Sequence, residues 1–459
     1  MAQSVARTID LTHGDPLRLI LRFSLPILCG NLFQQLYNMA DGIIVGQCIG
    51  TGAFAAVGAT GSISFLIIGF ILGCSSGFCI PISQCFGAGD SAGMRRCTAN
   101  IVWLGAAVAA VVTTLMMFTT RGLLTLMDTP DDIFRDSFLY IYIIFAGIPA
   151  CMFYNVQAGL MRAVGDSRSP LYFLIISCAV NVVLDLVCIA GFGMGVEGAA
   201  IATVISQLLS GILCFLWILH RFPMLHPHGS DWKPDFPTMK RLLSIALPMG
   251  FQFSITAIGA VILQSAVNTL GSEIIASISA ASKIQNIVFA PMETLGLTMA
   301  TYCGQNLGAG RIDRIRLGMR RCVAASLVLS VICCLFVTFF SRYVALLYIK
   351  PHETAILANI TYYLRICGIF YPPLALIFVF RNAIQGMGYS VPAMAAGLFE
   401  LAARAAVALG FVRSVGFTAA AIANPMAWIA ADLFLIPMYI RVIRKFTKNS
   451  PPKPDVISG

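Results

Sequence analysis

Stretches of about 20 or more apolar residues recur along the whole chain, and they limit its possible folds more than any other feature. Each stretch is long enough to cross the ~30 Å hydrocarbon core of a bilayer as an α-helix. Of the 459 residues, 58% are hydrophobic and 11% are charged, whereas soluble proteins carry about 25% charged residues. The sequence therefore predicts an all-α, polytopic membrane protein.

Twelve membrane-spanning helices are predicted from these stretches. Their approximate bounds are 17–45, 54–84, 98–119, 137–161, 170–191, 196–219, 240–268, 275–303, 322–341, 356–384, 391–411 and 416–441. The N-terminus lacks an apolar stretch followed by a small-residue cleavage site, so we expect no removable signal peptide.

Basic residues are distributed unequally between the two ends of these spans. With twelve spans, 22 of the 30 Lys and Arg fall on the side of the N-terminus, 5 fall on the opposite side, and Lys283, Arg365 and Arg404 fall within spans. By the positive-inside rule the rich side is cytoplasmic. We expect a monomer in the cell inner (plasma) membrane with both termini cytoplasmic. The net charge of +10 indicates attraction to anionic lipid rather than a nucleic-acid partner.

The second half of the chain repeats the first. "FSLPI" at 23–27 matches "IALPM" at 245–249, "SQCFGAG" at 83–89 matches "GQNLGAG" at 304–310, and "MRRC" occurs at 94–97 and 319–322. "GVEGAAIAT" at 195–203 likewise matches "GFTAAAIAN" at 416–424, all at offsets of 221 to 225. Such repeats form two lobes with the substrate path between them. We expect two six-helix lobes related by a pseudo-two-fold axis along the membrane normal.

The polar, Pro-rich segment 222–239 divides the two lobes, which we place at 1–221 and 240–446. This segment is expected to be a cytoplasmic inter-lobe loop, and residues 447–459 a cytoplasmic tail. Pro26 and Pro248 interrupt the first span of each lobe at matching depth. Because proline bends a helix, the two residues are candidate hinges, and a static kink is the alternative.

A stripe of polar side chains follows one broad face of the first span. It consists of Asn31, Gln34, Gln35, Asn38 and Asp41, with Tyr37 at its edge. Amides and a carboxylate at membrane depth must face partners or water, because lipid offers them no hydrogen bonds. The first span is therefore predicted to line a wet cavity.

A second aspartate lies in the fifth span, where Asn181 and Asp185 are four residues apart and share a face. Thr203 and Gln207 have the same spacing in the sixth span. Burial and a neighbouring carboxylate both favour the protonated form of an aspartate. The group Asp41, Asn181, Asp185 and Thr203 could therefore exchange a proton, and its oxygens would also suit Na⁺. Helix–helix packing through polar groups is the alternative role.

The second lobe does not repeat the aspartate of the first span, and offers Gln264 and Asn268 instead. Glu400 and Arg404 are four residues apart, so we expect a structural ion pair between them. Glu293 and Asp432 are also predicted within spans, either as a second ion site or as partners of a base. The fifteen cysteines lack metal-ligand spacing and are expected to act as small apolar residues, so we predict no metal site.

The sequence resembles the multidrug and toxic compound extrusion (MATE) transporters, most closely the DinF-like branch. The resemblance covers nearly the whole chain and depends on "SLPILCGNLFQQLYNMADGIIVG", the paired "GAG" loops, "GLMRAVGDSRSP" at 159–170, "NVVLD" and "GVEGAAIAT". It implies efflux of amphipathic, often cationic drugs in exchange for H⁺ or Na⁺, with no cofactor. It places the coupling site at Asp41, Asn181, Asp185 and Thr203. Substrate contacts are expected at Gln34, Tyr37, Asn155 and Gln157.

Three other functions were weighed against an antiporter. A membrane enzyme is disfavoured, because no histidine lies in a span and no HExxH or GxSxG motif occurs. A channel does not account for a duplicated hinge. The serious alternative is a flippase for lipid-linked oligosaccharides, whose anionic cargo requires a basic cavity. Lys283, Arg365, Arg381 and Arg404 favour that alternative, while the acidic first lobe favours a cationic cargo.

Overall fold

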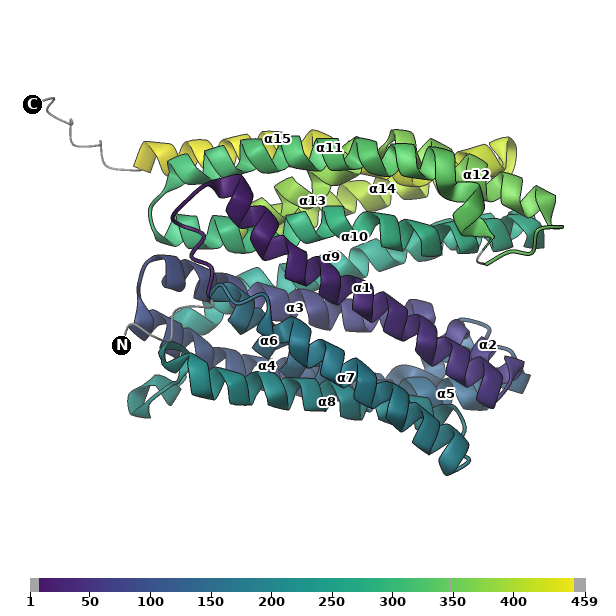
Figure 1. The fold of residues 1–459 in the computed structure, drawn as a ribbon, viewed down its shortest axis with the longest axis horizontal. Helices are drawn as coiled ribbons and strands as arrows, with labels where there is room; N and C mark the ends of the chain where they lie inside the picture. Colours follow the sequence, from purple (N-terminus) through teal and green to yellow (C-terminus); the bar gives the residue numbers. More distant parts are fainter. Residues whose placement is uncertain (1–7, 347, 450–459) are drawn as a thin grey trace, which may run out of the picture.

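The computed structural model describes residues 8–346 and 348–449, which form helices joined by short turns (Figure 1). The first half contains α1 (Pro16–Cys48), α2 (Thr51–Ala59), α3 (Gly61–Gly87), α4 (Ser91–Leu126), α5 (Asp131–Ala146), α6 (Ile148–Ala163), α7 (Ser169–Asp185), the π-helix η1 (Leu186–Gly191) and α8 (Val196–Arg221). The second half contains α9 (Phe236–Val267), α10 (Ser272–Gly308), α11 (Ile312–Ala345), α12 (Thr354–Ile369), α13 (Tyr371–Gly386), α14 (Ser390–Val415) and α15 (Phe417–Asn449). The 3-10 turns η2 (Pro223–Leu225) and η3 (Gly229–Trp232) lie between the halves, and η4 (Asn268–Leu270) follows α9.

The prediction of an all-α membrane protein with twelve spans is confirmed. Ten helical segments are long and apolar enough to cross a membrane, and two bent pairs of helices, α5 with α6 and α12 with α13, complete the set. The bends measure 46° and 54°. Both follow from proline at the start of the second helix, where the ring removes a backbone donor.

The predicted bounds of one span are wrong. The span expected at 54–84 is two helices, because α2 ends at Ala59 and α3 starts at Gly61. Glycine at positions 58 and 61, beside Thr60, weakens helix continuity there. Helix α15 runs on to Asn449, past the predicted start of the tail. The remainder of that tail, 450–459, lies outside the described residues.

The helices divide into two groups with separate hydrophobic cores. One core is built mainly by α3–α8, and the other by α9–α15 together with Ile20 and Phe23 of α1. We call α1–α8 the first lobe and α9–α15 the second lobe. Figure 1 shows α4–α8 on one side, α11–α15 on the other, and α1, α3, α9 and α10 between them. Within this central set α3 packs on α9, and α1 and α3 both pack on α10.

The two candidate hinge prolines lie inside long helices. Helix α1 is continuous through Pro26, and α9 is continuous through Pro248. The helix start of α1 and the end of α15 lie at the same end of the molecule, as an even number of spans requires (Figure 1). We call this end the N-terminal end.

Candidate functional site

Two aspartates from different helices meet in the first lobe. Asp41 lies on α1 and is 9% exposed, and Asp185 is the last residue of α7 and is fully buried. Helices α1 and α7 pack side by side, and the two carboxyl groups interact directly. The structure therefore brings together the two acids that the sequence analysis placed in one site.

The polar atoms around this pair lack protein partners. Oδ1 of Asp41, both carboxyl oxygens of Asp185 and both amide atoms of Asn181 are buried and make no hydrogen bond to the described residues. Within residues 8–346 and 348–449, no basic side chain forms an ion pair with either aspartate. Buried charges normally require a partner, so the group is suited to hold a proton or a small cation.

Two tyrosines and a threonine border the aspartates. The Tyr37 hydroxyl and Oγ1 of Thr203, on α8, are 3.1 Å apart and share a hydrogen bond. Tyr140, on α5, interacts electrostatically with both Asp41 and Asp185. Tyr140 was not predicted as a site residue, because a tyrosine among apolar residues of a span is also typical of a helix end near the lipid interface.

Local structure fixes the position of Asp185. The Ser177 hydroxyl donates to the Ser206 carbonyl and so joins α7 to α8. Directly after Asp185 the chain continues as the π-helix η1, a conformation that is rare and often found at functional sites. A small apolar cluster that includes Val45 and Ile189, one turn beyond the two aspartates, packs next to the site.

The other predicted site residues are not all brought together. Gln34 is exposed on α1, and Asn155 donates to the Cys151 carbonyl one turn back in its own helix, at 2.8 Å. Gln157 is buried in α6. Among the described residues, none of these three forms a hydrogen bond with the aspartate pair, so their role in substrate binding stays a prediction.

The expected ion pair of the second lobe has a different partner. Glu400 pairs with Arg381 of α13, and not with Arg404 one turn away on its own helix. Arg404 instead points to α9, where it donates to the Thr256 carbonyl at 3.4 Å. A partner on a neighbouring helix can face a buried carboxylate directly, whereas both members of an i, i+4 pair point outward from the same helix.

Two more acids of the second lobe have contrasting surroundings. Asp432 interacts electrostatically with Arg381 and therefore belongs to the same buried charge group as Glu400. Glu293, on α10, has no ion pair or hydrogen bond among the described residues. Gln264 and Asn268 hydrogen-bond each other at 2.8 Å on an exposed surface.

The lobes contact each other at the N-terminal end through matched residues of the repeat. Gln84 of α3 donates to the Gly386 carbonyl at 3.1 Å, and Gln305 of α10 donates to the Ala163 carbonyl at 2.9 Å. A Cβ atom on Gly308 would lie 1.8 Å from the Gln84 carbonyl oxygen. Backbone therefore meets backbone where α3 and α10 cross. We call these contacts the inter-lobe contact.

Residues 9–15 extend across this inter-lobe contact, and we call them the strap. In the first lobe, the Ile9 amide donates to the Gly165 carbonyl at 2.9 Å. Gly165 has φ +90°, and a Cβ there would lie 2.4 Å from the Ile9 carbonyl oxygen, so only glycine fits. In the second lobe, the Leu11 amide donates to Oε1 of Gln305 at 3.1 Å.

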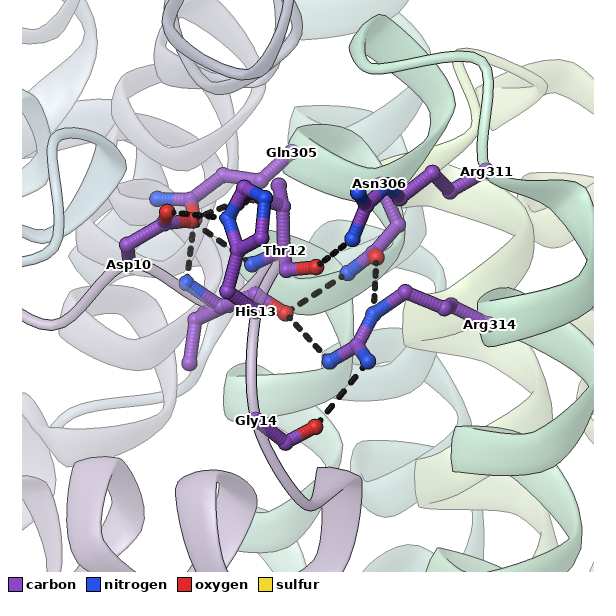
Figure 2. Close-up of polar contacts among 9 residues, drawn as sticks. Asp10, Thr12, His13, Gly14, Gln305, Asn306, Arg311 and Arg314 are labelled. Carbon is purple, nitrogen blue, oxygen red and sulfur yellow. Dashed lines mark hydrogen bonds and ion pairs between the residues drawn. The ribbon is translucent and has the colours of Figure 1, made fainter.

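Side chains of the second lobe donate hydrogen bonds to backbone carbonyls of the strap (Figure 2). Asn306 donates to Leu11, Arg311 to Thr12, and Arg314 to both Leu11 and Gly14, at 2.6–3.3 Å. Asp15 also pairs with Arg321. Because the strap binds both lobes, it stabilises the arrangement in which they touch at this end.

A metal centre finds no support among residues 8–346 and 348–449. No group of three or more His, Cys, Asp or Glu side chains there could hold a metal ion. All fifteen cysteines are free, and most are buried.

Comparison with known proteins gives one family and a consistent set of relatives. A sequence model of the MatE family matches residues 26–187 and 248–410, once in each half of the chain. The probable multidrug resistance protein YpnP of Bacillus subtilis is 26% identical, over 83% of this chain and 85% of its own. An FAD transporter of Shewanella oneidensis is 23% identical, over 80% of this chain and 82% of its own.

Solved structures share the fold. An outward-facing multidrug resistance MATE family transporter superposes with a TM-score of 0.90 at 23% sequence identity, covering 96% of this chain and 99% of its own. A MATE structure described as the bent conformation gives a TM-score of 0.88 and covers 98% of this chain. The two-lobed architecture is therefore that of known MATE structures.

Proposed function

The chain belongs to the MatE family of transporters, and on this premise we propose that it exports amphipathic, often cationic small molecules in exchange for H⁺ or Na⁺. The observation that carries the proposal is the buried pair of Asp41 and Asp185, in which Oδ1 of Asp41 and both carboxyl oxygens of Asp185 make no hydrogen bond to the described residues. Relatives named as multidrug resistance proteins support the class of cargo.

The aspartate pair is the proposed coupling site, with Asn181 and Thr203 beside it. Two carboxylates in contact repel each other, and the repulsion is removed when a proton or Na⁺ binds between them. Titration then belongs to the pair and not to one residue. Asn181 supplies a further free oxygen, and the Tyr37–Thr203 hydrogen bond connects α1 to α8 beside the pair.

Coupling to transport is proposed to act through α1. This helix carries Asp41 in its second half and starts directly after the strap, with Pro26 between the two. Binding of an ion or proton at Asp41 can therefore alter the inter-lobe contact if it makes α1 bend at Pro26. Pro248 is the counterpart of this hinge in α9. Gln34, Tyr37, Asn155 and Gln157 are proposed as substrate contacts.

The proposed placement in the cell follows from the basic residues. The N-terminal end is cytoplasmic, in a plasma (inner) membrane, and the protein acts as a monomer. The lobes then correspond to residues 1–221 and 240–446, and 222–239 is a cytoplasmic connection. In this orientation the strap and the inter-lobe contact close the path on the cytoplasmic side.

The flippase alternative requires free positive charge facing the cargo. The buried bases of the second lobe are engaged, since Arg381 pairs with Glu400 and Arg404 donates to a backbone carbonyl. In the first lobe, by contrast, both carboxyl oxygens of Asp185 and Oδ1 of Asp41 are buried with neither an ion pair nor a hydrogen bond among the described residues. This balance supports a cationic cargo.

The test is transport of a cationic dye in proteoliposomes under an imposed pH gradient or Na⁺ gradient. Wild type should respond to one of the gradients, which identifies the ion, and Asp41→Asn and Asp185→Asn should lose that response. Glu293→Gln, which changes a half-buried acid of the second lobe, is the matched control and should keep it. Coupled transport by both aspartate variants would refute the proposed site.

A further inference from the structure

A pocket of about 370 Å³ lies on the second lobe between α11, α13 and α15. It is lined by Arg316, Met319, Arg320, Val323, Phe380, Tyr439, Ile440, Ile443 and Arg444. Helix α11 starts here and α15 ends here, so the pocket lies at the N-terminal end of the membrane-spanning region. It is separate from the aspartate site, which lies in the first lobe.

Three of the lining residues are arginines, and none is an acid. Arg316 donates to the Thr447 hydroxyl, and both Arg316 and Arg320 interact electrostatically with Tyr439. All three arginines are exposed, and none forms an ion pair within residues 8–346 and 348–449. Asp313, three residues before Arg316, is the nearest acid along α11, and it is not part of the lining. The pocket is therefore a concentration of uncompensated positive charge.

The remaining wall is apolar and aromatic. The rings of Phe380 and Tyr439 meet edge to face, with centroids 5.3 Å apart. Met319, Val323 and Ile440 extend the wall along α11 and α15. A site with arginines at its rim and an apolar wall matches an amphipathic ligand whose anionic head lies at the end of a hydrocarbon chain.

The repeat shows how the same position is occupied in the first lobe. "MRRC" of α4 corresponds to "MRRC" of α11, so Arg95 is the counterpart of Arg320. Arg95 forms an ion pair with Asp231 of the segment after α8, at 3.0 Å. That segment folds back on α4, where Trp103 also donates to the Trp232 carbonyl at 3.1 Å. In the first lobe, the chain itself neutralises the arginine and covers the surface.

In the second lobe, the described residues up to Asn449 do not fold back in this way. Under the 221-residue offset, the position of Arg221, where α8 ends, corresponds to Val442, and α15 continues as a helix beyond it. Arg444 therefore adds a third positive charge where the first lobe has the acidic segment. Among the described residues the two lobes differ at this position, because Arg95 of the first lobe has an acidic partner and its counterpart Arg320 has none.

We propose that this pocket binds the head group of an anionic phospholipid from the adjacent leaflet. The guanidinium groups of Arg320 and Arg444 hold the phosphate, since arginine binds phosphate oxygens in a two-pronged geometry. Arg316, one turn before Arg320 on the same face of α11, adds charge beside them, and the acyl chains lie along Met319 and Val323. Basic pockets between membrane helices are a recognised form of anionic-lipid site.

The test is native mass spectrometry of the full-length protein with equal amounts of palmitoyl-oleoyl phosphatidylglycerol and phosphatidylcholine. Wild type should retain one phosphatidylglycerol in preference to phosphatidylcholine. The double variant R320Q/R444Q should weaken phosphatidylglycerol binding by roughly tenfold or more, since each arginine near a lipid surface contributes about fivefold. R320K/R444K keeps the charge and should recover part of the binding.

The matched control is R22Q/R96Q, which removes two exposed arginines at the same end but outside the pocket. Its phosphatidylglycerol binding should equal that of wild type. Equal retention of the two lipids by wild type, or unchanged binding by R320Q/R444Q, would overturn the proposal. Displacement of the bound lipid by millimolar inorganic phosphate would also overturn it, because the site would then be one for soluble anions.

Discussion

Replacing Gln305 by methionine tests whether the strap and the inter-lobe contact stabilise the same closed arrangement. The Gln305 side chain accepts from the Leu11 amide and donates to the Ala163 carbonyl, at 3.1 and 2.9 Å. Methionine fills nearly the same volume but makes neither hydrogen bond. One donor of the strap and one acceptor of the first lobe then lose their partners in a buried region.

The size of the effect follows from these two groups. An unpaired buried backbone group costs about 1–3 kcal/mol, so the pair costs ~2–6 kcal/mol. A difference of 1.4 kcal/mol is a factor of ten in an equilibrium constant. The lower value of ~2 kcal/mol therefore raises the equilibrium constant for separation of the lobes at this end by about 30-fold. The remaining strap contacts from Asn306 and Arg314 are unchanged.

The assay is hydrogen–deuterium exchange of the Ile9 and Leu11 amides in detergent or nanodiscs. The Leu11 amide loses its acceptor in the variant, whereas the Ile9 amide keeps the Gly165 carbonyl and so reports release of the strap itself. Both should exchange at least about 30-fold faster in Gln305→Met, by the lower bound. Gln264→Met, on an exposed surface, is the control and should leave both rates unchanged. Unchanged exchange at Ile9 and Leu11 in folded Gln305→Met would refute the reasoning.

Two further substitutions test the buried charge pair and the helix crossing. Glu400→Gln leaves Arg381 without its ion-pair partner, which typically costs about 3–5 kcal/mol of folding free energy. We expect a lower midpoint of thermal unfolding in detergent. An unchanged midpoint would contradict an ion pair between Glu400 and Arg381. Gly308→Ala places a Cβ 1.8 Å from the Gln84 carbonyl oxygen, so we expect the lobes to separate at this end and dye efflux from cells to fall. Gly122→Ala, where a Cβ meets nothing within 4 Å, should leave efflux normal.

The parts of the molecule that the sequence predicted correctly depend on short-range rules. Apolar length fixes the number of spans, and the cost of a carboxylate in lipid forces Asp41 and Asp185 inward. The repeat at a constant offset identified Gln84 and Gln305 within matching motifs. Their matching hydrogen bonds across the lobes could not be predicted, because a repeat shows equivalence and does not show contact.

The features that could not be predicted from the sequence depend on contacts between distant segments of the chain. Glu400 has a base four residues away on its own helix, yet its partner is Arg381 on another helix. Asp136 and Ser137 lie one turn before Tyr140, but at the predicted start of a span such polar residues are expected near the membrane surface and do not mark a site. The strap has neither the period of a helix nor that of a strand, and its partners are defined only once the second lobe is folded.

The strap also imposes an order on synthesis. The Leu11 amide and its acceptor on Gln305 are 294 residues apart, and Asp15 and Arg321 are 306 apart. At a translation rate of about 5–20 residues per second, the first segment made waits roughly 15–60 s for the last partner it needs. During that interval the helices of the first lobe enter the membrane one by one while the strap has no partner from the second lobe. The inter-lobe contact and the strap are thus completed only after α10 and the start of α11 have been made, although the strap precedes α1.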